Sequence, residues 1–151
     1  MRMRARFNHD AIADGLWAGG GAAILSGVPS TAWALMTGAD PLNAARAAGN
    51  LVLPADAPRS ALLAAGALAH IAISLGWSTL LAAWLPERKT VLWGILAGAL
   101  IAAFDLGLIG RWFELIAKLN LLPQLADHLA YGAIASGVIQ ARRQRRAHRA
   151  R

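Results

Sequence analysis

Twenty-five consecutive residues, from Gly15 to Ala39, carry no charged side chain. A helix of about 20 apolar residues crosses the hydrocarbon core of a bilayer, so this run favours an integral membrane protein. The composition agrees, because charged residues make up only 15% of the chain and the mean hydropathy is +0.45. About a quarter of the residues in a typical soluble domain are charged. The chain is therefore predicted to form a single membrane domain, residues 1–151.

The apolar pattern predicts an all-α protein with four transmembrane helices arranged as two tandem helix hairpins. The expected spans cover residues 11–36, 60–85, 90–110 and 121–140. Short segments after the first and third spans are predicted to lie at the membrane interface. The first of these contains Asp40 and Pro41, a typical helix start. The second, residues 111–119, mixes aromatic and basic side chains.

Lysine and arginine are distributed unevenly on the two sides of these spans. One side carries three at the N-terminus, two in the loop at residues 86–89 and six in the tail, whereas the other side carries four. Basic residues concentrate on the cytoplasmic side of membrane proteins, so both termini are predicted to be cytoplasmic.

The last residues, 141–151, form a strongly basic tail. Beside a membrane helix such a tail is expected to contact anionic lipid head groups rather than nucleic acid. The residues expected to make these contacts are Arg142, Arg143, Arg145 and Arg146. Asp14, one turn into the first span, is interpreted as a favourable charge near a helix N-terminus.

Small residues recur at four-residue spacing along the spans and indicate an internal repeat. Such ridges let helix backbones approach closely in lipid. The predicted packing glycines are Gly15, Gly19, Gly27, Gly94, Gly98 and Gly132. In each half, a glycine-ridge helix precedes a helix that carries one histidine, so the repeat is predicted to be parallel.

Four ionisable residues fall inside the predicted spans. His70 follows Arg59 by 11 residues and His128 follows Lys118 by 10, which places both histidines at nearly the same depth. Asp105 is expected within one or two turns of that level. Because ionisable groups at membrane depth usually face the protein interior, we expect a polar cluster of three residues with a fourth nearer its rim. The cluster is His70, Asp105 and His128, with Asp127 at the rim.

Several roles for this cluster stay open. It could fix helix packing, relay protons or a small solute, or hold haem b through His70 and His128 as axial ligands. A divalent metal bound with Asp105 is a rarer alternative, and the absence of cysteine excludes thiolate ligands. No serine or threonine has a base nearby in sequence, so no catalytic residue is assigned.

The expected function is that of a structural or accessory subunit, an interaction module within the membrane. Its glycine faces would serve self-association as a homo-oligomer or docking on a larger membrane complex. A pathway for protons or a small solute is the alternative, and haem b binding is a second alternative.

The repeated small-residue helices and the last span, HLAYGAIASGV, resemble small uncharacterised four-helix membrane proteins of bacteria, those called YagU-like. The resemblance covers most of the chain. It implies a multi-pass protein of the bacterial inner membrane and no catalytic residue.

Overall fold

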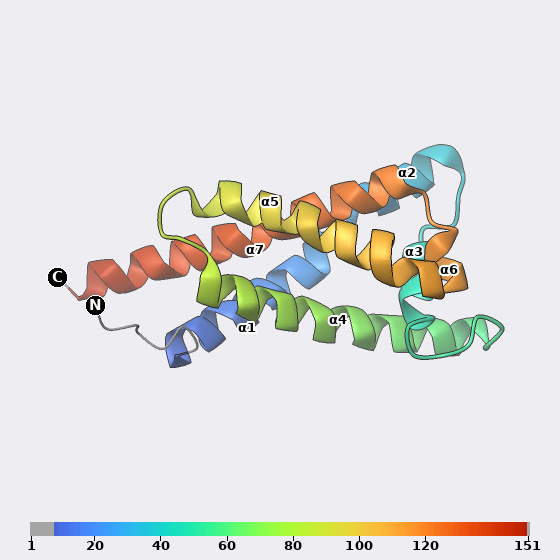
Figure 1. Ribbon diagram of the computed structural model, residues 1–151, viewed down its shortest axis with the longest axis horizontal. Coiled ribbons are helices and arrows are strands. Elements are labelled where there is room, and N and C mark those ends of the chain that lie inside the picture. Colours follow the sequence, from blue (N-terminus) through green and yellow to red (C-terminus); the bar gives the residue numbers. More distant parts are fainter. Residues whose placement is uncertain (1–7, 151) are drawn as a thin grey trace.

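The computed structural model describes residues 8–150, which form a bundle of helices. The elements in order are α1 (His9–Leu25), α2 (Val28–Thr37), α3 (Asn43–Gly49), α4 (Arg59–Trp84), α5 (Thr90–Ala102), the π-helix η1 (Ala103–Leu108), the 3-10 helix η2 (Ile109–Trp112), α6 (Glu114–Ala117) and α7 (Leu121–Arg149). The long helices run along one common direction (Figure 1). The start of α1 and the end of α7 lie at one end of the bundle, and α3 and α6 lie at the other (Figure 1).

Three helical stretches among residues 8–150 are long and apolar enough to cross a membrane: His9–Thr37, Arg59–Trp84 and Thr90–Trp112. Residues 121–140, predicted as a fourth span, are not among them. Helix α7 is 29 residues long, but its first turns carry Gln124, Asp127 and His128, which lower its hydropathy.

Helix α7 is the inner helix of the bundle. From Pro123 to Gln140 none of its residues is exposed, because α1, α2, α4 and α5 all contact it. Polar side chains on this helix therefore face other helices instead of the surroundings. The exterior is apolar by contrast, with Ile24 80% exposed and Leu68 and Leu100 each 72% exposed.

The first predicted span is interrupted. Helix α1 ends at Leu25 and α2 begins at Val28, with Gly27 as its N-cap and Pro29 in its first turn. Proline lacks an N–H and its ring clashes with the carbonyl four residues earlier, so the helical stretch His9–Thr37 is kinked and loses its regular hydrogen bonds here. Gly27, one of the predicted packing glycines, has no neighbour within 4 Å of an added Cβ. Its place is at the break rather than in a helix contact.

Helix pairs α1–α4 and α5–α7 make the most extensive contacts in the bundle. In the first pair, a Cβ added at Gly15 would meet the backbone of Thr79, and one added at Gly19 would lie 2.9 Å from the Cα of Leu75. These approaches leave no room for a side chain on the glycine-bearing helix.

The second pair repeats this arrangement. Gly94 lies against Ser136, and Gly98 lies against the carbonyl of His128, with Gly132 opposite both. Five of the six predicted packing glycines are thus buried between helices of the same chain.

The short helix α3 packs on the first turns of α4. Gly49 contacts the Leu62 backbone, and Gly66 contacts the Ala45 carbonyl. Asn50 then joins α3 to α6, because its Nδ2 donates to the Leu53 carbonyl at 3.0 Å and its Oδ1 accepts the Leu115 N–H at 3.1 Å. The two segments expected at the membrane interface therefore form one packed cap over this end of the bundle.

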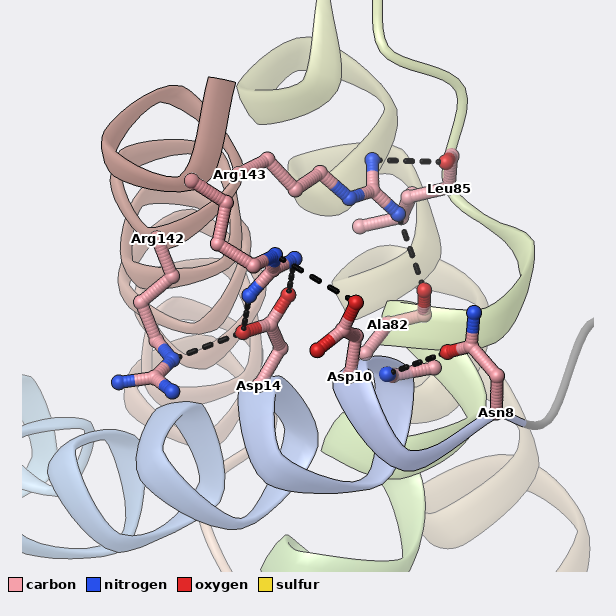
Figure 2. Close-up of polar contacts among 9 residues, drawn as sticks. Asn8, Asp10, Asp14, Ala82, Leu85, Arg142 and Arg143 are labelled. Atoms are coloured by element: carbon pink, nitrogen blue, oxygen red, sulfur yellow. Dashed lines mark hydrogen bonds and ion pairs between the residues drawn. The ribbon is translucent and has the colours of Figure 1, made fainter. Parts of the chain in front are cut away.

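The basic tail continues α7 and binds the other end of the bundle. Arg142 donates to Asp14 at 2.8 Å, and Arg143 donates to the carbonyls of Ala82 and Leu85 at 2.9 and 3.1 Å (Figure 2). Arg146 contacts both oxygens of Asp14. Three of the four arginines expected at lipid head groups thus have partners within the protein, and Arg145 is exposed. The N-terminal arginines used to predict orientation lie outside the described residues.

Candidate functional site

A cavity of about 620 Å³ lies at the end of the bundle that α3 and α6 cap. Its walls come from α2, α3, α4, η1, α6 and α7 and are mostly apolar. All four members of the predicted polar cluster line it: His70, Asp105, Asp127 and His128. The structure therefore places these residues around one cavity, although each makes its own separate contacts.

Asp127 caps helix α2 from across the bundle. Its Oδ1 accepts the backbone N–H of Ser30 at 2.8 Å. Ser30 lies in the first turn of α2, where backbone N–H groups have no partner within the helix. A negative charge at a helix N-terminus is also favoured by the helix dipole. The break before α2 thus creates the donor that holds one oxygen of Asp127.

His70 contacts the other side of the same break. Its Nε2 lies 3.0 Å from the carbonyl oxygen of Ala23, in the last turn of α1. A carbonyl there has no intrahelical donor, so Nε2 carries the hydrogen and donates it. Together His70 and Asp127 satisfy backbone groups on both sides of the interruption. Sequence analysis missed this role, although Pro29 inside an apolar run was a visible signal for the break.

His128 and Asp105 form a pair that holds a proton. The Nδ1 of His128 lies 2.8 Å from the Gln124 carbonyl, so it donates to that oxygen. Its Nε2 lies 3.4 Å from Oδ2 of Asp105. This contact is favourable only when a proton lies between the two atoms, either on the imidazole or on the carboxyl. In both cases the pair has no net charge.

The cavity ends at an aromatic floor. Tyr131 donates to the Ser74 carbonyl at 2.6 Å, and the Ser78 hydroxyl lies 2.6 Å from the Tyr131 oxygen. Trp77 and Phe104 meet edge to face, with ring centroids 6.1 Å apart. Beyond this floor the core is packed, and its completely buried members include Ala18, Ala22, Ala135 and Ile139.

Exposed residues of the cavity wall lie on α4 and η1 and also at Thr31, Pro41 and Leu42, between the start of α2 and the start of α3. Helix α4 contacts α1 and α3 extensively, but it makes few contacts with α5 or η1. Ala67, His70 and Ile73 of α4 and Phe104 of η1 line the cavity and are exposed at the same time. A molecule could therefore enter from the flank of the bundle.

The histidines are not arranged as a pair of free axial ligands. The Nε2 atom of each contacts a protein oxygen, at Ala23 and at Asp105, and haem iron bound through both atoms would displace these contacts. Among residues 8–150, no group of three or more His, Asp or Glu side chains is arranged to hold a metal ion.

Fold and cavity together define a small helical bundle with an apolar exterior, a polar inner helix and a cavity that opens sideways. Comparison with protein-family models, curated proteins and solved structures finds no match.

Proposed function

We propose that this chain is a multi-pass protein of the bacterial inner membrane that binds a small amphiphilic molecule in the cavity without transforming it. The observation that carries this proposal is the cavity of about 620 Å³, whose wall includes exposed residues of α4 and η1. Its volume lies in the range of small-molecule sites, which are mostly apolar with a few polar groups. In a bilayer, these exposed residues face the acyl chains, where an amphiphile is already concentrated.

The apolar exterior supports the membrane location. Soluble monomers rarely expose large contiguous apolar patches, and here apolar side chains cover the long helices on their outer faces. Helix α7 packs against both α5 and α1. We therefore propose that it crosses the membrane with them, as a fourth helix shielded from lipid. This location is also what the resemblance to YagU-like proteins implies.

The positive-inside rule supports the proposed orientation. The loop at residues 86–89 lies at the same end of the bundle as the basic end of α7, because Arg143 of α7 binds the last turn of α4. This end is proposed to be cytoplasmic. Arg145, which is exposed there, is available for anionic lipid head groups.

A pathway across the membrane has less support. The aromatic floor at Tyr131 and the packed core beyond it separate the cavity from the other end of the bundle. Docking on a larger complex through the glycine ridges also loses its basis, because five of the six predicted glycines pack within the chain. An accessory protein that presents a membrane-resident molecule fits these observations better.

The test is binding of a neutral apolar dye, N-phenyl-1-naphthylamine, to the full chain in lipid nanodiscs. The variant Ala67→Trp adds a bulky side chain to the cavity wall at an exposed position. The matched control is Leu68→Trp on the same helix, because Leu68 is 72% exposed and lies outside the cavity wall. Wild type and Leu68→Trp should show saturable binding above that of empty nanodiscs, and Ala67→Trp should lose most of it. Equal binding by all three proteins would show that the cavity is not the site.

A further inference from the structure

We infer that the cavity selects a lipophilic organic cation, such as an amine or quaternary ammonium centre that carries apolar groups. This inference rests on the proposed function and names the class of molecule that the cavity takes. The inference follows from which charged side chains line the cavity and which of them have a partner of opposite charge.

The wall carries two carboxylates and no lysine or arginine. Asp105 and Asp127 line the cavity. Arg111 and Lys118 are close in sequence to lining residues, but they are not part of the wall. Asp105 is balanced, because it shares a proton with His128 and the pair has no net charge. His70 donates to the Ala23 carbonyl through Nε2.

Asp127 has no lysine or arginine partner among residues 8–150, and the titratable side chains that act on it are the imidazoles of His128 and His70. No residue between 8 and 150 forms an ion pair with it, whereas Asp14, Asp40 and Glu114 all have basic partners. Its Oδ1 accepts the backbone N–H of Ser30, and the Ser30 side chain also lies beside the carboxylate. A carboxylate in an apolar setting is costly unless a cation accompanies it. A bound organic cation would supply that charge.

The remaining wall suits the rest of such a molecule. Trp77, Phe104 and Tyr131 present aromatic surface to the cavity, and aromatic rings attract cations through their faces. Apolar side chains of the turn after α3 and of α6, including Leu51 and Ile116, would surround the apolar groups. An anionic amphiphile would instead meet Asp127 with like charge, which is unfavourable at short range.

Two probes of equal shape and opposite charge test this inference: tetraphenylphosphonium and tetraphenylborate. Binding of each to the full chain in neutral detergent is measured by equilibrium dialysis, with empty micelles as background. The cation should bind saturably at one site, and the anion should bind about tenfold more weakly or not at all.

The variant Asp127→Asn removes the charge and keeps an oxygen that accepts the Ser30 N–H. It should weaken tetraphenylphosphonium binding about tenfold and abolish the preference over tetraphenylborate. The control Asp56→Asn changes an exposed carboxylate outside the cavity and should leave both affinities unchanged.

The outcomes separate the two proposals. Equal affinity for both ions in wild type, or cation binding unchanged in Asp127→Asn, would overturn the charge selection and leave the amphiphile site in place. If the neutral dye also fails to bind wild type, the proposed function is overturned together with this inference. The comparison of the two ions in wild type is decisive even if Asp127→Asn does not fold.

Discussion

Asp14 of α1 and Arg146 of α7 are 132 residues apart in the chain, and the guanidinium of Arg146 binds both carboxylate oxygens of Asp14. Asp14 is only 1% exposed, whereas the side chain of Arg146 is 36% exposed. The hydrogen bond from Arg146 to Asp14 raises the pKa of the arginine above its ordinary value. A buried carboxylate is thus neutralised by an arginine that reaches it from the tail, and Arg142 adds a second contact at 2.8 Å.

Replacing Asp14 with asparagine should destabilise the protein. The variant leaves Arg142 and Arg146 without an anionic partner. The asparagine amide would face them with either its NH₂ group, which cannot accept a hydrogen bond, or its carbonyl oxygen, which is a weaker acceptor than a carboxylate. We expect a loss of about 2 kcal/mol of unfolding free energy, because both arginines are partly exposed and can recover some hydration. Thermal unfolding in detergent would measure this as a lower Tm.

The control for this change is Asp10→Asn. Asp10 lies one turn earlier on α1, 65% of its side chain is exposed, and Arg146 is 3.8 Å from it. Surface ion pairs of this kind contribute little, so the Tm should hardly change. Equal loss in both variants would mean that net charge at this end matters and the buried contact does not.

Arg143 caps the C-terminus of α4. The last carbonyls of a helix have no intrahelical donor, and Arg143 donates to two of them, at Ala82 and Leu85. Arg143→Ala should therefore cost about 1 kcal/mol of stability. Arg145→Ala removes a neighbouring arginine that is exposed and should have no measurable effect. Hydrogen exchange of the amides in the last turn of α4 would locate the loss, and unchanged exchange in Arg143→Ala would contradict the cap.

The pairing of the helices could be predicted because it depends on local spacing. Glycines four residues apart on one helix mark the face that approaches a neighbour, and the pairs α1–α4 and α5–α7 use those faces. The ends of α4 also follow from the local sequence, since Pro58 precedes its start and Pro86 follows its end.

The site could be predicted only in part, because its contacts join residues far apart in sequence. Helix rise predicts a shared depth for His70 and His128, and both histidines line the cavity. The partners of the cluster residues do not follow from sequence spacing. Asp127 binds Ser30, 97 residues away, and His70 binds Ala23, 47 residues away. Both contacts depend on the break between α1 and α2, which an apolar count treats as one continuous span.

The role of the tail was beyond reach for a similar reason. A run of arginines predicts a basic segment but does not say which anion it meets. From the sequence of the tail, a lipid phosphate and the carboxylate of Asp14 are equally suitable partners. Only the docking of α1 against α7 brings Asp14 beside Arg142 and Arg146.

The connection between α2 and α3 should titrate at low pH. The backbone N–H of Leu42 and, more weakly, the guanidinium of Arg59 hold the pKa of Asp40 below its ordinary range. The native contacts favour the carboxylate, so their contribution is present above the ordinary pKa of an aspartate and is lost as pH falls through the lowered native value. The carboxyl carbon shift in NMR would report this titration.

In the variant Arg59→Gln, the pKa of Asp40 should rise only part of the way toward its ordinary value. Arg59 lies 2.8 Å from the Asp40 carboxylate, but the hydrogen bond from Leu42 remains when the arginine is removed. A complete return to the ordinary value would assign the whole shift to Arg59 and would contradict the role of the Leu42 N–H.

Gly98 of α5 should not tolerate a larger side chain. A Cβ at this position would overlap the carbonyl oxygen of His128, which is backbone and cannot rotate away. Gly98→Ala should therefore separate α5 from α7 and cost about 2 kcal/mol, despite the better helix propensity of alanine. Because His128 carries the contact to Asp105, the same substitution should also weaken binding in the cavity.

The matched control is Gly137→Ala on α7, where an added Cβ has no neighbour within 4 Å and alanine should leave the Tm unchanged or raise it. Equal stability of the two variants would show that the α5–α7 contact can relax, and the two helices would then not set the position of His128.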